Sequence, residues 1–307
     1  MNDKLTQVMH GWAESLVNLV PVLTGSDKTA TMAQVRASYT AFQAQQPAPG
    51  GMRFEDVDMG GVPATLVQPE VKTSDIVLLY LHGGAYIVGE PDGYRGIGGN
   101  YAKLIGGSVY IPNYRLAPEH PFPAAIDDSL SAYEWLLEQG IPAEKIAFAG
   151  ESAGGSMVVS VMVAAKQKGL PLPAAGLAIS PWANLEHTGA SMTNREGLDP
   201  LNTKPLLDLL ARTFLAGELP NHPLASPVFA DVTGLPPILV QIGENELMLS
   251  DAVRLASHLA ENRVRVNLEV WPGMPHAWHF FQSFLPEAGQ ALQASARFIS
   301  ETVSTAN

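Results

Sequence analysis

Residues 145–155 read KIAFAGESAGG and carry the strongest structural signal in the sequence. An apolar run of strand type leads into GESAGG at 150–155, and a long apolar run of helical type follows. The small residues allow a sharp strand-to-helix turn in which two backbones pass closely. In this context Gly-x-Ser-x-Gly predicts a turn that lifts the hydroxyl of Ser152 out of the sheet as a nucleophile. A glycine-rich turn with Ser152 as helix N-cap is the purely structural alternative.

Strand-like and helix-like runs alternate on both sides of this turn. We expect strands at 53–58, 62–68, 76–81, 108–112, 145–149, 175–180, 237–242 and 265–271. We expect helices at about 95–105, 124–139, 153–168, 251–262 and 285–303. Continuous apolar strands joined to helices by short loops predict an α/β protein with a mostly parallel central sheet and helices on both faces.

Two segments fall outside this alternation. Residues 1–47 read as two helices and are expected to form an N-terminal helical cap. Residues 48–307 then form the main α/β domain. Within it, 183–222 lacks a strand signal and contains a helix-like piece at 204–215, so we expect a cap insertion above the carboxyl ends of the strands, where ligands bind.

Composition excludes several classes of function. The chain has 307 residues, 18 basic and 30 acidic, and a net charge of −12. An acidic surface repels phosphate, which argues against nucleic acid or an anionic membrane as partner. The absence of Cys excludes disulfides, zinc-thiolate sites and a cysteine nucleophile. The first residues lack an unbroken apolar core of signal-peptide type, and no apolar run is long enough to span a bilayer, so we expect a cytoplasmic protein.

A second glycine-rich stretch supports the chemistry suggested at Ser152. His82-Gly83-Gly84-Ala85 directly follows the strand-like run 76–81. Acyl transfer through a tetrahedral intermediate needs backbone N–H donors that are already in place. Such donors come from a loop of this type and from the residue after the nucleophile. We therefore predict an oxyanion hole formed by Gly83, Gly84, Ala85 and Ala153.

The order Ser, acid, His requires a histidine after the last strand. His276 follows the run 265–271 and its turn, and His279 is the rival. A metal site at His276-x-x-His279 is weakly supported, because no HExxH or carboxylate motif accompanies it. We expect no metal and no cofactor.

The acid that orients the histidine should follow the run 237–242. The candidates are Glu244, Glu246 and Asp251. Ser250 is a good N-cap, which would place Asp251 in the first turn of a helix, where acidic residues have a structural role. Glu246 has no such role, so we prefer it and keep Asp251 as the alternative.

These motifs together resemble those of the bacterial hormone-sensitive-lipase-like (family IV) esterases, a branch of the α/β-hydrolase fold. The shared stretches are HGGA at 82–85, YRLAPEHPFPAA at 114–125, GESAGG at 150–155, SPW at 180–182 and Pro275-His276. They fall within roughly residues 50–300.

The resemblance implies Ser152 as nucleophile, His276 as base, and oxyanion donors from the 83–85 loop and Ala153. It also implies an N-terminal helical cap and short-chain acyl esters as substrates. Around the YRLAPE stretch we interpret Arg115, Glu119 and Asp128 as structural.

The chain departs from the family pattern at two positions. Glu246 stands where the family usually has Asp, and aligning the loop from Gly243 places Glu246 at the acid position. Asn184 stands where the family usually has Asp shortly after Ser-Pro-Trp, which puts in doubt any cap contact that this Asp makes.

The sequence thus predicts a serine carboxylesterase that hydrolyses short- to medium-chain acyl esters through an acyl-enzyme intermediate. One alternative keeps the same triad but acts on a lactone or an acetylated natural product, and a peptidase of this fold is a further variant. An alternative of another class is a non-catalytic small-molecule-binding protein on the same scaffold. Candidate pocket residues are Trp12, Tyr86, Trp182 and Met248, each of which could instead be packing. The last strand reads as a sheet edge, which would favour a homodimer.

Overall fold

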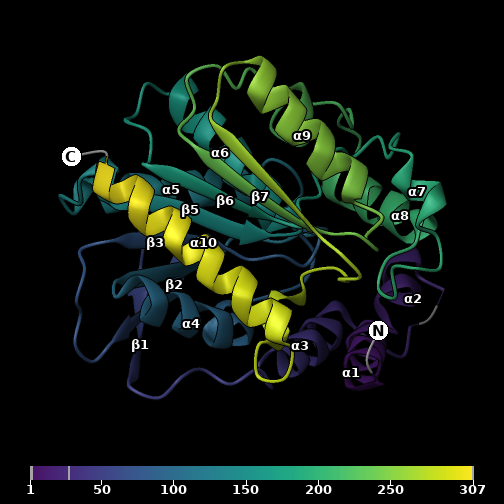
Figure 1. Ribbon diagram of the computed structural model, residues 1–307. Helices are drawn as coiled ribbons and strands as arrows, with labels where there is room; N and C mark the ends of the chain where they lie inside the picture. Colours follow the sequence, from purple (N-terminus) through teal and green to yellow (C-terminus); the bar gives the residue numbers. More distant parts are fainter. Residues whose placement is uncertain (1–2, 27, 306–307) are drawn as a thin grey trace.

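The computed structural model describes residues 3–26 and 28–305, and its centre is one sheet (Figure 1). The strands lie in the order β1-β2-β4-β3-β5-β6-β7-β8. They are β1 (Met52–Asp58), β2 (Pro63–Pro69), β3 (Val77–Leu81), β4 (Ser108–Pro112), β5 (Ile146–Glu151), β6 (Ala175–Ile179), β7 (Ile238–Gly243) and β8 (Val266–Trp271). The β1–β2 and β2–β4 pairs are antiparallel and the other neighbouring pairs are parallel. The predicted mostly parallel sheet is confirmed.

Helices cover both faces of this sheet. On one face α4 (Arg95–Ile105) contacts α10 (Pro286–Thr305), which crosses in front of the strands in Figure 1. On the other face α5 (Ala124–Glu138) packs against α6 (Ala153–Gln167), and α9 (Leu249–Glu261) covers β7 and β8. This two-layer covering is the α/β-hydrolase arrangement that the sequence predicted.

The continuous apolar runs explain why the strands lie where they do. Every residue of β3, β5, β6 and β7 is buried. A strand covered by helices on both faces has no solvent-facing side, so it gains free energy from apolar residues at every position rather than at alternate ones. Helix α6 is buried from its first residue to Ala165, which fixes the turn at its start rigidly against the core.

The N-terminal region differs from the prediction in one respect. Its described residues, 3–26 and 28–47, form three helices rather than two: α1 (Asp3–Ser15), α2 (Leu19–Thr24) and α3 (Met32–Gln43). The chain ends α2 at Gly25, which takes a left-handed φ of 67°. A capping box formed by Thr31 and Gln34 starts α3. The apolar residues Val35, Tyr39 and Phe42 of α3 are buried.

The region between β6 and β7 contains α7 (Ser191–Asn194) and α8 (Lys204–Leu215). No strand forms in 183–222, and α8 has the predicted bounds. Figure 1 shows α7 and α8 close to α2, at one end of the sheet. The division of the chain into an N-terminal cap, a main domain and a cap insertion stays a prediction.

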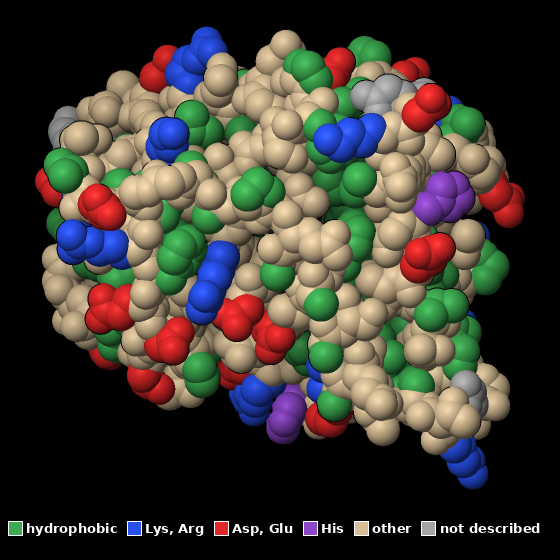
Figure 2. Space-filling model, turned by 90° about the horizontal axis from the view of Figure 1, so that it is seen from below, with side chains coloured by type: hydrophobic (Ala, Val, Ile, Leu, Met, Phe, Trp, Pro, Cys, Tyr) green, Lys and Arg blue, Asp and Glu red, His purple; other side chains and the backbone are tan. Residues whose placement is uncertain are grey.

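The surface is acidic, in keeping with the net charge. Figure 2 shows acidic side chains gathered on part of the face seen from below, with a few basic ones among them. Among the described residues, no helix is both long and apolar enough to cross a bilayer. Strand β8 ends the sheet and leaves Leu268 and Val270 exposed. The homodimer that this edge would favour stays a prediction.

Candidate active site

Ser152 lies in the turn between β5 and α6. Its backbone takes φ 57° and ψ −120°, a strained conformation for a residue with a side chain. Its N–H donates to the carbonyl of Ile179 (2.9 Å) and its carbonyl accepts from the N–H of Trp182 (3.1 Å). A Cβ at Gly154 would lie 1.9 Å from the carbonyl oxygen of Leu81, so only glycine fits there. The turn has the geometry expected of a nucleophile elbow.

The loop after β3 lies beside this turn. Gly84 and Ala85 line one cavity together with Ser152. Gly84 has φ 102°, and a Cβ there would lie 2.1 Å from the carbonyl oxygen of Val88. Ala85 takes φ 55° although it carries a side chain. Ala153 is the first residue of α6, where an N–H has no acceptor within its own helix. The roles of Gly84, Ala85 and Ala153 as oxyanion donors stay predictions.

Gly83 is a correction to the predicted oxyanion hole. Its N–H donates to Oε1 of Glu151 and is therefore not available to a substrate oxygen. A Cβ at Gly83 would lie 2.5 Å from the same carboxylate oxygen. The prediction failed because the motif shows that a loop offers N–H groups but not which way each one points.

Glu151 was missed as a functional residue. It is buried directly before Ser152, lines the cavity, and also accepts a hydrogen bond from the hydroxyl of Tyr80 (2.6 Å). Burial raises the pKa of Glu151 to about 7, against the opposing effect of its hydrogen bonds from Tyr80 and Gly83. The signal in the sequence is a carboxylate at the buried end of an otherwise apolar strand.

His276 and Glu246 are brought together as predicted. Nδ1 of His276 lies 2.8 Å from Oε2 of Glu246. The other carboxylate oxygen accepts from the N–H of Gly243 (2.6 Å) and the hydroxyl of Ser180 (2.8 Å). Burial opposes a charge on His276, but the Glu246 carboxylate outweighs it and raises the pKa of the imidazole. Since a carboxylate accepts, Nδ1 carries the hydrogen and Nε2 is left as the basic nitrogen.

The rival acids point elsewhere. Oδ2 of Asp251 accepts from the N–H of Asn184 (3.2 Å), and Oε2 of Glu244 accepts from the N–H of Gly273 (2.9 Å). Asp251 lies in the first turn of α9, as expected, but that helix begins at Leu249, so Ser250 is not its N-cap. Of the three acids considered, Glu246 is the one that contacts His276.

His279 has a structural environment. Its Nε2 lies 2.9 Å from the side-chain oxygen of Gln241, and its ring contacts Trp278. Burial lowers the pKa of His279 to about 3, so it stays neutral at ordinary pH. Within residues 3–26 and 28–305, no cluster of His, Cys, Asp and Glu could hold a metal ion.

Ser152 and His276 line the same cavity of about 60 Å³. A water needs roughly 10–15 Å³ of volume measured in this way, so the cavity has room for about four to six waters. Its walls are mostly apolar and come from two sides. The sheet side contributes Gly84, Ala85, Val88, Glu151, Ser152, His276 and Ala277, and the helical side contributes Trp12, Leu16, Leu19, Tyr39, Leu201, Asn202, Leu206 and Leu210.

Three predicted pocket residues are corrections. Tyr86, Trp182 and Met248 are buried and do not line this cavity. Tyr86 stacks on Phe214 of α8 with ring centroids 3.7 Å apart, and it therefore packs behind the cavity wall. Trp12 does line the cavity, and its ring lies 6.4 Å from that of His276. The position of a residue near a motif in the sequence does not show whether its side chain faces the cavity or packs behind the residues that line it.

The YRLAPE region ties other parts of the molecule together. The guanidinium of Arg115 donates to both oxygens of Asp128. Arg36 of α3 forms an ion pair with Glu119 and also donates to the carbonyls of Ile87 (2.9 Å) and Ala117 (3.0 Å). These contacts fit the structural interpretation of Arg115, Glu119 and Asp128.

Comparison with known proteins agrees with this fold. A family model described as the alpha/beta hydrolase fold matches residues 78–280. The chain is 41% identical over 243 residues to an acetyl-hydrolase of Streptomyces hygroscopicus, which covers 79% of this chain and 81% of that protein. It is 32% identical over 241 residues to an ethyl acetate hydrolase of Pseudomonas putida, covering 75% and 76%.

Among solved structures, the chain is similar to an esterase from the bacterial hormone-sensitive lipase family. The TM-score is 0.91 at 37% identity, and the match covers 99% of both chains. This chain belongs to the α/β-hydrolase fold and, within it, to the bacterial hormone-sensitive-lipase family of esterases.

Proposed function

We propose that the protein is a serine carboxylesterase for short- to medium-chain acyl esters, with Ser152, His276 and Glu246 as its triad. One observation carries the proposal: Ser152 and His276 line one cavity, and Nδ1 of His276 is hydrogen-bonded to the buried Glu246. A base held in the correct tautomer beside a serine on a strained turn is the arrangement that acyl transfer requires.

The reaction has two balanced steps. Nε2 of His276 takes the proton of Ser152 as Oγ bonds to the ester carbonyl carbon, and the carbonyl oxygen becomes an oxyanion. N–H groups of Gly84, Ala85 and Ala153 stabilise that charge. The intermediate collapses, the C–O bond to the alcohol breaks, and His276 returns its proton to the leaving oxygen. In the second step His276 takes a proton from water as the water oxygen attacks the acyl carbon. The bond from that carbon to Oγ of Ser152 then breaks, the proton returns to Ser152, and the carboxylic acid is released.

The small cavity favours the short end of the acyl range. A volume of about 60 Å³ with mostly apolar walls suits an acetyl to butyryl group rather than a long fatty chain. Two relatives carry the names acetyl-hydrolase and ethyl acetate hydrolase, which supports the same range. The first of these names also supports a second candidate substrate, an acetyl group on a larger natural product.

The test is hydrolysis of p-nitrophenyl esters from acetyl to palmitoyl, with the Ser152→Ala variant beside the wild type. We expect activity that is highest at short chains and lost in the variant, whose thermal unfolding is unchanged. Acetylated sugars and lactones extend the same assay to the alternative substrates. Folded wild-type protein that binds these esters without turning them over would instead favour the non-catalytic binding protein.

A further inference from the structure

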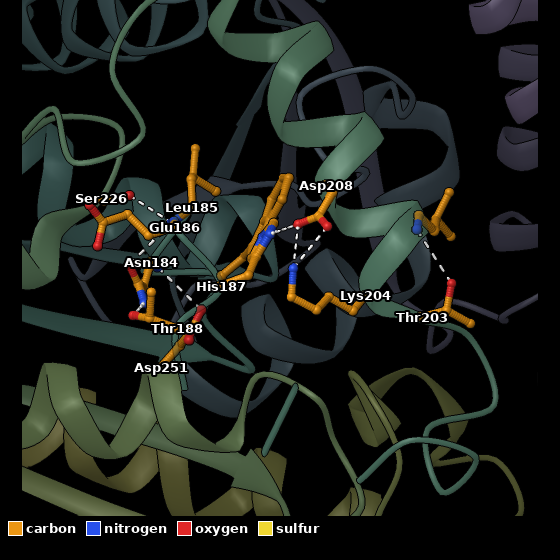
Figure 3. A network of polar contacts seen from close by, with 12 residues as sticks. Asn184, Leu185, Glu186, His187, Thr188, Thr203, Lys204, Asp208, Ser226 and Asp251 are labelled. Carbon is orange, nitrogen blue, oxygen red and sulfur yellow. Dashed lines mark hydrogen bonds and ion pairs between the residues drawn. The ribbon is translucent and has the colours of Figure 1, made fainter. Parts of the chain in front are cut away.

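Helix α8 presents opposite sides to the cavity and to a polar network. Leu206 and Leu210 line the cavity. Asp208 lies two residues from each of them, about 200° around the helix axis, and so faces away. Its carboxylate contacts His187 Nδ1 (2.7 Å) and Lys204 Nζ (2.9 Å), as Figure 3 shows. A contact on the side of α8 that faces away from the cavity therefore influences the position of Leu206 and Leu210.

Hydrogen bonds hold the loop that carries His187 in place. The N–H of Asn184 donates to the buried Asp251 of α9 (3.2 Å), and the N–H of Leu185 donates to the hydroxyl of Ser226 (2.8 Å) (Figure 3). The side chain of Asn184 also donates to Thr188 (3.2 Å). Because this loop is held at several points, a contact between it and α8 positions α8 rather than the loop.

His187 connects this loop to α8 through both of its ring nitrogens. The indole N–H of Trp182 can only donate, so Nε2 of His187 accepts it (2.8 Å). Nδ1 of the neutral ring then carries the hydrogen and donates to Asp208. The two rings are within 7° of parallel, which is compatible with a bond that lies in both ring planes. Since the backbone N–H of Trp182 donates to the carbonyl of Ser152, the chain of contacts runs from α8 to the nucleophile turn.

The environment of His187 keeps its ring in this neutral form. Its side chain is 1% exposed. Burial lowers the pKa of His187, against the opposing effect of Asp208, and Lys204 acts in the same direction as burial. A protonated ring would set its Nε2–H against the indole N–H of Trp182, so the neutral tautomer is the one that holds both bonds.

We propose that the hydrogen bond from His187 to Asp208 positions α8 and thereby sets how large a substrate group fits beside Ser152. The inference rests on the proposed esterase function. Two other contacts lie near the ends of α8, and its buried residues Leu207 and Ala211 pack on the core. Asp199 accepts from the N–H of Leu247 before the helix, and Phe214 stacks on Tyr86 near its last turn. Between these ends, the Asp208 contact ties the side of α8 that faces away from the cavity to His187, so it opposes movement of Leu206 and Leu210 into the cavity.

The test compares selectivity rather than activity alone. We would measure kcat/KM for p-nitrophenyl acetate and hexanoate, and for ethyl and hexyl acetate, so that acyl and alcohol groups are varied separately. For Asp208→Ala we expect α8 to move toward the cavity, so the ratio of the longer to the shorter substrate should fall roughly threefold to tenfold in one of the two series. This is less than the ten- to two-hundredfold that a whole methylene is worth in an apolar pocket.

Three further variants make the test specific. Asp208→Asn keeps an acceptor for Nδ1 of His187 and should retain the wild-type ratio. Lys204→Ala removes the other partner of Asp208 and should also leave the ratio unchanged. His187→Phe removes both ring hydrogen bonds and should act like Asp208→Ala. If this buried variant fails to fold, Asp208→Ala still decides, because that side chain is one-third exposed.

Two results would overturn the inference. One is a ratio within twofold of the wild type for Asp208→Ala in both series. The other is an equal change in Lys204→Ala, which would indicate a general effect of surface charge on α8. Ser152-dependent hydrolysis with an unchanged ratio would leave the proposed function intact. Wild-type protein that hydrolyses none of these esters would remove both.

Discussion

The two sides of the cavity are held in different ways. On the sheet side, Gly84, Ala85 and Ser152 have positive φ in short turns at the ends of buried strands. On the helical side, the walls belong to helices attached by side-chain contacts such as Arg36–Glu119 and His187–Asp208. Short turns with steric restrictions leave the reacting groups little freedom, whereas partly exposed polar contacts can be exchanged one at a time. We infer that chemistry depends on the first side and substrate choice on the second.

After loss of the nucleophile Ser152, the largest effect should come from the acid on the sheet side. Glu246→Ala removes the partner that sets the tautomer of His276, so we expect kcat to fall by up to about 10⁴-fold, the loss seen when a triad acid is disabled. Asp251→Ala should reduce kcat less than about tenfold and act mainly on stability, because Asp251 binds the loop at Asn184. Steady-state kinetics of both variants would check this, and the reverse ranking would make Asp251 the acid.

Variants of Glu151 test whether its carboxylate must hold the loop of residues 83–85 in place. Glu151→Ala leaves the N–H of Gly83 and the hydroxyl of Tyr80 without their acceptor. Losing the function of one oxyanion donor costs about 10²- to 10³-fold, and a displaced loop should cost less, so we expect a fall in kcat of roughly ten- to a hundredfold with little change in KM. Glu151→Gln keeps an acceptor and should restore most of the activity. A loss confined to KM would contradict this role.

The pH dependence of activity tests the pairing of His276 with Glu246 on the sheet side. The Glu246 carboxylate raises the pKa of His276, and the base must be neutral to act, so activity should fall as pH drops through a value above the ordinary 6.5. Glu246→Gln removes the negative charge, and the midpoint of this acid limb should move to lower pH, by about one unit for each 1.4 kcal/mol of lost interaction. Residual activity measured from pH 5 to 9 checks the direction. An upward shift would exclude this pairing.

The smallest effects should come from the helical side. Arg36 is 26% exposed and Glu119 is 48% exposed, and Arg36 also donates to the carbonyls of Ile87 and Ala117. Arg36→Ala should therefore raise KM a few-fold, about two- to fivefold, while Glu119→Ala stays within twofold, as exposed ion pairs contribute little. Progress curves with p-nitrophenyl butyrate would measure this. Equal effects would show that the ion pair matters more than the two carbonyl contacts.

The difference between the two sides also explains what could be predicted from sequence. Ser152 and Glu246 each follow a buried strand and His276 follows the edge strand β8. The order of parallel strands brings such positions to one edge of the sheet. The direction of an individual N–H, as at Gly83, depends on a neighbour that the motif does not name. The packing of Tyr86 and Trp182 behind the wall, and the breaking of 1–47 into three helices, depend on tertiary contacts and single capping residues. The bond between His187 and Asp208 joins two segments that show no pattern in common.

The most direct test of the central claim is to identify the residue that carries the acyl group. Wild-type protein would be mixed with p-nitrophenyl butyrate, quenched in acid within milliseconds, digested and analysed by peptide mass spectrometry, with Ser152→Ala and Glu246→Ala treated alongside. We predict a butyryl adduct on Ser152 in the wild type, slower formation of the same adduct in Glu246→Ala, and no adduct in Ser152→Ala. An adduct on another residue, or rapid turnover in the Ser152→Ala variant, would contradict the triad.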